Sequence, residues 1–245
     1  MNVGIIPARL ASNRFPKKIL AILDGKPLIA HVMERALKAE KLDKVILAID
    51  SEETREALKD FDFEMVMTSQ EHLSGTDRVA EVVQGIEEAK VIINIQGDEP
   101  LVDPNVIDGL VDTFQDPAVN MATVVSRKLI VNDLLNPNVV KAILDEKRNA
   151  VEFKRNIFDL EIGGVYRHIG MYGFHRKAPF HFTVLEPSIR EQERRLEQMR
   201  ALDNDISIRA LITASNSWAV DTKEDLNKVS QIIGSSIEAA VVQDG

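Results

Sequence analysis

The 245-residue sequence contains no cysteine. This absence excludes a disulfide framework, cysteine-ligated zinc, an iron–sulfur cluster and thiol catalysis, and it fits a reducing compartment. The sequence also lacks a basic and then apolar leader, and none of its apolar runs approaches the ~18–20 residues that span a bilayer. We therefore expect a cytoplasmic protein without membrane insertion.

Positive charge is in deficit, because 30 lysines and arginines stand against 39 aspartates and glutamates, which gives a formal net charge of −9. An acidic surface does not attract duplex nucleic acid, so no nucleic-acid partner is expected. Several catalytic signatures are missing as well. The P-loop, the G-x-G-x-x-G turn, H-E-x-x-H and G-x-S-x-G do not occur, which disfavours P-loop kinases, Rossmann dehydrogenases, zincins and α/β-hydrolases.

Short apolar runs alternate with amphipathic stretches in the first half of the chain. The runs predict strands at residues 3–6, 44–49, 64–67 and 90–96. The stretches predict helices at residues 28–37, 54–61 and 76–88. This alternation indicates parallel strands with helices on both faces and ligands at the carboxyl ends of the strands. With an antiparallel or mixed extension in the second half, the fold class expected is α/β with a Rossmann-like mixed sheet.

The second half of the chain has a different pattern. It predicts strands at residues 121–126, 139–144, 166–174 and 206–212 and helices at 188–202 and 223–233. No linker rich in glycine, serine or proline and no fixed-period repeat divides the chain. We expect a single domain over residues 1–245 with a smaller lobe inserted at about residues 130–205.

A basic segment follows the first predicted strand. Four cations precede the first acid, Asp24, and they are Arg9, Arg14, Lys17 and Lys18. Arginine forks and lysine point charges suit a triphosphate, and a strand end is where α/β sheets bind ligands. A solvated basic loop is the alternative.

Two acidic segments could hold Mg²⁺. Asp98 follows the most hydrophobic predicted strand, although it could equally cap the backbone of a turn. Asp221 precedes the last helix and could be a second ligand or simply the cap of that helix, with Asp225 completing a capping box.

Two further segments carry polar groups. Residues 74–78 open a predicted helix, whose free N–H groups suit an anion, although plain capping by Ser74 or Thr76 is the alternative. In residues 167–174, His168, Gly170 and Tyr172 share one face of a predicted strand, which suits a polyhydroxylated or carboxylate ligand.

The ordered set of motifs resembles the 3-deoxy-manno-octulosonate cytidylyltransferase family. The resemblance spans nearly the whole chain in colinear order. It rests on the segments I-P-A-R-L-A-S-x-R-F-P-x-K, G-K-P-L-I-A-H-V, S-G-T-D-R, Q-G-D-E-P, R-H-I-G-M-Y-G and V-D-T-x-E-D-L.

The resemblance implies a nucleotide-diphospho-sugar transferase fold and a reaction of CTP with an eight-carbon 2-keto sugar acid in the presence of Mg²⁺. It implies catalytic roles for Arg9, Arg14, Lys18 and Asp98, and Mg²⁺ ligation by Asp98 and Asp221. Nucleotide contacts are implied for Ala8, Arg9, Ser74, Thr76 and Arg78. Sugar contacts are expected from Gln96, Glu152, Arg155, His168, Tyr172, Glu191 and Gln198. A homodimer formed through the inserted lobe is also implied, with the apolar strand at residues 165–174 as a contributor.

The sequence departs from the family pattern at several positions, mostly in the half that faces the sugar. Lys17 replaces a glycine, and unusual residues stand at Glu152, Lys154 and Arg194. Glu152 in place of tyrosine suggests pairing with the ammonium group of an 8-amino analogue of the sugar. The alternatives are a nucleotidyltransferase for another 2-keto sugar acid and an inactive nucleotide-sugar-binding regulatory protein.

Overall fold

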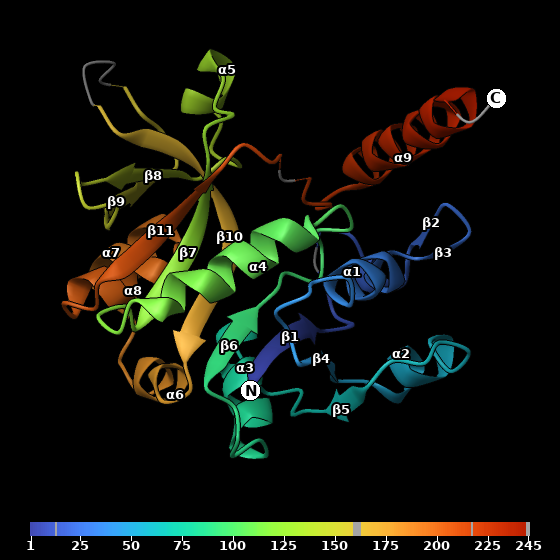
Figure 1. The fold of residues 1–245 in the computed structure, drawn as a ribbon, viewed down its shortest axis with the longest axis horizontal. Coiled ribbons are helices and arrows are strands. Elements are labelled where there is room, and N and C mark those ends of the chain that lie inside the picture. Colours follow the sequence, from blue (N-terminus) through green and yellow to red (C-terminus); the bar gives the residue numbers. More distant parts are fainter. Residues whose placement is uncertain (13, 159–162, 217, 244–245) are drawn as a thin grey trace.

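The computed structural model describes residues 1–12, 14–158, 163–216 and 218–243. Within those residues, nine strands form one mixed sheet, whose main path runs β11-β7-β10-β6-β1-β4-β5 (Figure 1). The strands of the path are β1 (Asn2–Ala8), β4 (Lys44–Ile49), β5 (Met65–Met67), β6 (Val91–Asn94), β7 (Met121–Ser126), β10 (Val165–His175) and β11 (Ile208–Thr213). The others are β8 (Lys141–Leu144) and β9 (Ala150–Lys154), which form a hairpin beside β10, and the separate pair β2 (Ile22–Leu23) and β3 (Lys26–Pro27).

The strands that the first half contributes to the main sheet are parallel. β1 lies between β4 and β6 and pairs in parallel with both, and β5 continues in parallel from β4. The carboxyl ends of β1, β4 and β6 therefore meet at one edge of the sheet, where parallel α/β sheets bind ligands. β10 runs antiparallel to β6 and β7, which makes the sheet mixed. The predicted fold class is confirmed.

Helices cover both faces of the sheet, so the apolar residues form two cores. Along β1, Val3 and Ile5 face one core, while Ile6 and Ala8 face the other, as the two-residue period of a strand requires. The first core includes α1 (Leu28–Ala36) and α4 (Pro104–Asp112), and the second includes α3 (Gly75–Gln84), α6 (Ala178–Thr183) and α8 (Gln198–Asp203). The remaining helices are α2 (Glu52–Ala57), α5 (Val131–Leu134), α7 (Ile189–Arg194), α9 (Lys223–Gln243) and the 3₁₀ turns Lys18–Leu20 and Thr113–Gln115.

Some predicted boundaries are wrong. The single helix predicted at residues 188–202 is two helices, because Arg195 adopts a left-handed conformation with φ of 54° and ends α7. α8 then starts after Glu197, which leaves that residue at a turn. The last helix extends to Gln243, ten residues beyond its predicted end at residue 233.

β10 pairs with other strands of the sheet on both sides, and the expected contribution of residues 165–174 to a dimer stays a prediction. Its first half pairs with β7 and β8 and its second half with β6 and β7, so both of its edges are occupied. The pairing of β10 with β7 is irregular between Ile169 and Tyr172. None of the helices in the described ranges is long and apolar enough to cross a membrane.

A fully buried lysine holds the segment between α5 and β8. The Lys141 ammonium group is 0% exposed and donates to the carbonyl oxygens of Asp133 at 2.8 Å, Val139 at 2.7 Å and Asn136 at 3.1 Å, and also to that of Arg155. Burial lowers the pKa of Lys141, and nearby Asp133 opposes that shift. Four backbone acceptors, one in α5, two between α5 and β8 and one directly after β9, thus depend on one side chain.

We expect Lys141→Met to lower the free energy of unfolding by about 3 kcal/mol, because it leaves buried carbonyl groups without a donor. Chemical denaturation monitored by circular dichroism measures this loss. Lys147→Met is the matched control, since Lys147 is exposed in the β8–β9 turn and should change stability by less than about 0.5 kcal/mol. Equal effects of the two substitutions would contradict the structural role of Lys141.

Candidate active site

A cavity of about 480 Å³ opens at the carboxyl ends of β1 and β6, beside the N-terminus of α3. Its volume suits a small-molecule ligand. Eight residues predicted from the sequence line it, namely Arg9, Arg14, Lys18, Ser74, Arg78, Gln96, Asp98 and Asp221. The structure thus brings the basic segment, the helix start and both acidic segments to one site.

Lys18 contacts two carboxylates in one part of this cavity. We call the group formed by Lys18, Arg14, Asp98 and Asp221 the charged corner. The Lys18 ammonium group donates to Asp98 Oδ2 at 2.8 Å and to Asp221 Oδ1 at 3.1 Å, and Arg14 approaches the same Asp221 oxygen at 2.9 Å. Burial lowers the pKa of Lys18, but the two carboxylates more than offset this, so the pKa is raised above its ordinary value. The lysine is therefore fully charged at neutral pH.

Local structure leaves both carboxylates free for this corner. Thr222, not Asp221, caps α9, because its hydroxyl accepts from the Asp225 N–H at 3.2 Å while the Asp225 carboxylate accepts from the Thr222 N–H at 3.0 Å. The Val220 N–H donates to the Asp98 carbonyl at 2.9 Å and fastens the two acidic segments together. The capping alternative for Asp221 is therefore wrong.

The two carboxylates fit a divalent metal that keeps other oxygen ligands. Both reach one ammonium nitrogen, so a cation at that position contacts both. Within the described parts of the chain, no group of three or more acidic or histidine side chains could hold a metal. Two carboxylates with the remaining positions filled by phosphate or water match the usual coordination of Mg²⁺.

The N-terminus of α3 forms a second wall. Ser74 caps the helix by accepting from the Asp77 N–H at 3.1 Å, while Asp77 accepts from the Ser74 N–H, so the capping alternative for Ser74 is confirmed. Ser74 also lines the cavity, so the same residue caps α3 and faces the ligand space. Gly97 is required on the opposite side, because a Cβ there would lie 2.9 Å from the Pro7 carbonyl oxygen.

Arg78 is a buried part of the wall. Its guanidinium group is paired with Asp50 at 3.1 Å and also donates to the Thr68 hydroxyl. Burial lowers the pKa of Arg78, and Asp50 opposes the shift. Asp50 in turn accepts from the Leu10 N–H at 2.9 Å and so holds the basic segment. Asp50 was missed from the sequence, although it directly follows a predicted strand.

Glu197 is the second residue that sequence reasoning missed. It lines the cavity from the turn before α8, and its Oε2 accepts from the Thr76 hydroxyl at 3.2 Å. Its Oε1 is buried without a hydrogen-bond partner. Burial raises the pKa of Glu197, and hydrogen bonds from Ser74 and Thr76 only partly offset this. No motif pointed to Glu197, because it lies inside the helix predicted at residues 188–202.

His72 also lines the cavity without having been predicted. Its Nε2 contacts the Glu81 carboxylate, which also accepts from the Ser69 N–H at 3.0 Å. These contacts tie the segment before Ser74 to α3. The pKa of the Glu81 carboxyl is lowered, since these hydrogen bonds outweigh its burial.

Six of the seven predicted sugar contacts do not line this cavity; Gln96 does. His168 and Tyr172 lie together on β10, with ring centroids 5.6 Å apart. Burial lowers the pKa of His168 to about 3, so it is neutral at pH 7, and it shares a 2.9 Å hydrogen bond with the Thr123 hydroxyl. Burial, followed by the charge of Glu197, raises the pKa of Tyr172.

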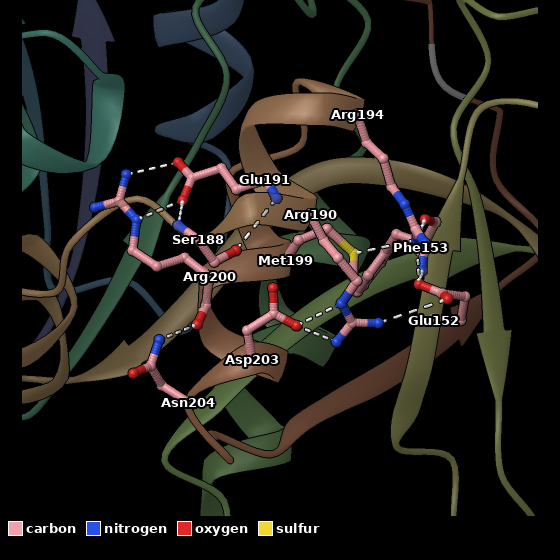
Figure 2. Close-up of polar contacts among 10 residues, drawn as sticks. All are labelled: Glu152, Phe153, Ser188, Arg190, Glu191, Arg194, Met199, Arg200, Asp203 and Asn204. Atoms are coloured by element: carbon pink, nitrogen blue, oxygen red, sulfur yellow. Dashed lines mark hydrogen bonds and ion pairs between the residues drawn. The ribbon is translucent and has the colours of Figure 1, made fainter.

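Glu152 lies in a charged network between β9, α7 and α8 (Figure 2). Its carboxylate contacts Arg194 at 2.5 Å and Arg190 at 3.7 Å, and Arg190 also pairs with Asp203. Two of the residues that depart from the family pattern, Glu152 and Arg194, therefore neutralise each other's charge. The carboxylate expected to face an ammonium group already has two guanidinium partners.

The remaining predicted sugar residues are also engaged inside the lobe. Glu191 forms a two-bond pair with Arg200 at 2.6 and 2.8 Å, shown in Figure 2. Arg155 donates to the carbonyl oxygens of Pro137, Arg194 and Arg195, at 2.8 to 2.9 Å. Gln198 is buried at the start of α8, next to Glu197. Two other predicted nucleotide contacts, Ala8 and Thr76, are buried beside the cavity.

The cytidylyltransferase family model matches residues 3–208, most of the chain. The chain belongs to the cytidylyltransferase family. This family member is 42% identical over 245 residues to a 3-deoxy-manno-octulosonate cytidylyltransferase of Pelobacter propionicus, with 93% of this chain and 96% of the relative covered. It is 40% identical over 246 residues to the enzyme of that name from Geobacter sulfurreducens, with 94% and 98% covered.

Comparison with solved structures agrees with the assignment of the chain to the cytidylyltransferase family. A CMP:2-keto-3-deoxy-manno-octonic acid synthetase complexed with CTP superposes with a TM-score of 0.90 at 34% identity, covering 96% of this chain and 99% of that chain. A 4-diphosphocytidyl-2C-methyl-D-erythritol synthase from Anaerococcus prevotii, at a TM-score of 0.67 and 11% identity, shares the fold alone.

We expect Glu197→Gln to stabilise the protein increasingly as pH rises. The raised pKa means that the fold favours the neutral carboxyl, so the wild type loses stability as pH rises from the ordinary value of 4.5 through the folded-state pKa. Below that window both variants should be alike. Thermal melting from pH 4 to pH 8 measures the difference, with the exposed Glu193→Gln as control. A pH-independent difference would contradict the raised pKa.

Proposed function

We propose that this cytidylyltransferase joins CTP to 3-deoxy-manno-octulosonate, giving the CMP-sugar and pyrophosphate. The observation that carries the proposal is the corner in which Lys18, Arg14, Asp98 and Asp221 converge at the carboxyl edge of the sheet. Cations and metal-binding carboxylates at one point are what phosphoryl transfer requires. The names of the relatives with 40–42% identity supply the sugar.

The reaction is an in-line displacement at the α-phosphorus. The anomeric 2-hydroxyl oxygen of the sugar forms a new bond to the α-phosphorus and releases its proton to solvent. The bond from the α-phosphorus to the oxygen that bridges it to the β-phosphorus breaks, and pyrophosphate leaves with that oxygen. Arg9, Arg14 and Lys18 provide the positive charge that binds the triphosphate. When bound at Asp98 and Asp221, Mg²⁺ would supply further charge to the phosphate oxygens.

The wall formed by α3 is assigned to the nucleoside. Ser74 and Arg78 line the cavity there, and the Thr76 hydroxyl donates a hydrogen bond to the Glu197 carboxylate. Backbone N–H groups at a helix N-terminus suit an anion or a polar base edge. Ala8 is the last residue of β1 and directly precedes the basic segment.

The sugar is assigned to the side of the cavity lined by Gln96 and Glu197. The other proposed sugar contacts lie on β9 or directly after it, on β10, on α7 and on α8. They are Glu152, Arg155, His168, Tyr172, Glu191 and Gln198. The ion pairs of Glu152 with two arginines favour the unmodified sugar acid over its 8-amino analogue, because an ammonium group would have to displace them. The segment at about residues 130–205 is the proposed sugar-binding and dimerisation lobe of a single domain.

A homodimer is proposed from an exposed apolar patch on this lobe. The patch comprises Ile130, Val131, Leu135 and Phe158, which are 63%, 80%, 59% and 82% exposed. The Ile157 N–H donates to the Leu134 carbonyl at 2.9 Å and brings its two segments together. Patches of this kind mark interaction sites. Because the proposed reaction consumes CTP, a cytoplasmic location is inferred.

We expect Asp98→Asn to reduce turnover by about 100-fold or more, because it removes a carboxylate of the charged corner. Pyrophosphate release is measured with each of the four nucleoside triphosphates against a panel of 2-keto sugar acids that includes the 8-amino analogue. CTP with 3-deoxy-manno-octulosonate should be the fastest pair. Asp60→Asn, at an exposed position, is the control. Unchanged turnover in Asp98→Asn, or a preference for another pair, would overturn the assignment.

We expect the wild type to sediment as a dimer and Val131→Asp to sediment near the 27.4 kDa mass of one chain, because a charge in the apolar patch opposes its burial. Analytical ultracentrifugation measures both masses. Val184→Asp is the control, since Val184 is 78% exposed at the end of α6, outside the patch. The proposed interface is wrong if Val131→Asp stays dimeric.

A further inference from the structure

The ammonium group of Lys18 occupies the position between the two carboxylates that are proposed to hold the metal. Lys18 Nζ lies 2.8 Å from Asp98 Oδ2 and 3.1 Å from Asp221 Oδ1, and the Lys18 side chain is only 13% exposed. Arg14 takes the same Asp221 oxygen at 2.9 Å. A metal ion at this point would therefore meet a lysine that is already bonded to both ligands.

The charges of the corner are balanced before any ligand arrives. Two cations, Lys18 and Arg14, face two carboxylates, Asp98 and Asp221. A divalent ion added to this group would leave two excess positive charges within a few ångströms of each other. Repulsion between like charges at such distances is substantial in a partly buried site. The free corner is thus poorly suited to a metal.

We propose that Lys18 keeps divalent metal out of the free protein, so that metal binds only together with the nucleotide. This inference rests on the proposed function, in which Asp98 and Asp221 hold the metal and the triphosphate enters the same corner. Lys18 then has two partners in turn: the carboxylates in the free protein and phosphate oxygens in the complex.

An exchange of ionic partners explains how the metal gains access. An entering triphosphate offers oxygens that accept from Lys18 and Arg14, and each cation leaves a carboxylate when it turns to phosphate. The freed carboxylates then face the metal that the triphosphate carries. The flexible four-carbon chain of lysine allows this movement with little change in the backbone. By linkage, metal and nucleotide each strengthen the binding of the other.

Lys17 provides a matched control one residue away. Its ammonium group pairs with Glu53 at 2.5 Å, its side chain is 59% exposed, and it does not line the cavity. Lys17→Gln and Lys18→Gln make the same change in total charge. A general effect of charge would therefore appear in both variants, whereas the proposed competition concerns Lys18 alone.

The experiment measures binding of Mn²⁺ to the full chain by electron paramagnetic resonance, without nucleotide or sugar. Relative to the wild type, Lys18→Gln should bind Mn²⁺ about tenfold more tightly or better, while Lys17→Gln should be unchanged. The double variant Lys18→Gln/Asp98→Asn should lose the gain. Circular dichroism checks that each variant is folded, and Lys18→Met replaces Lys18→Gln if the latter does not fold.

A second measurement adds a non-hydrolysable CTP analogue to the wild type, which should then bind Mn²⁺ about tenfold more tightly or better than the free protein. The proposal is overturned if Lys18→Gln gains no affinity, if Lys17→Gln gains as much, or if the double variant keeps the gain. It is also overturned if the free wild type binds Mn²⁺ as tightly as the nucleotide complex does. Because the first measurement contains no substrate, its failure is distinct from a failure to turn over CTP.

Discussion

The contact of Lys18 with Asp98 and Asp221 is the interaction around which the site is arranged. It joins residues that lie 80 and 203 positions apart in the chain, from the segment after β1, the end of β6 and the start of α9. The parallel pairing of β1 with β6 brings the first two together, and the hydrogen bond from Val220 to Asp98 adds the third. Charge balance at this point makes the corner stable without a ligand and responsive to one.

The charged side chains of β9, α7 and α8 differ from those of the cavity, since they pair with one another. Glu152, Arg190, Arg194 and Asp203 form one network, and Glu191 pairs with Arg200 beside it (Figure 2). Buried Lys141 donates to the backbone carbonyl oxygens of Asp133 in α5 and of Val139 between α5 and β8. Paired charges and satisfied carbonyl groups hold β9, α7 and α8 in place, and these elements set the position of Glu197 at the cavity.

Periodicity predicted the strands of the central sheet closely, because a buried strand needs a continuous or alternating apolar run. The strands at residues 44–49 and 121–126 were predicted with their observed bounds. β9 and α4 were not predicted. Two of the five residues of β9 are charged, which interrupts the apolar pattern of a strand. α4 begins at Pro104 after the cap Asp103, and these two residues are a local signal for a helix start. The break at Arg195 depends on a backbone conformation that propensity does not predict.

The sequence by itself determined the fold class, the order of the motifs and eight of the charged or polar residues that line the cavity, because local patterns, strand ends and the resemblance to the family pointed to them. Only the tertiary structure decided which partner each charge takes. It paired Asp221 with Lys18 and Glu152 with two arginines, and it placed Glu197 in the lining of the cavity. These contacts join side chains that are distant in the chain. The contact of Asp221 with Lys18 follows from the pairing of β1 with β6 and from the hydrogen bond of Val220 to Asp98, and the partners of Glu152 and the position of Glu197 follow from the packing of β9, α7 and α8. No local signal predicts them.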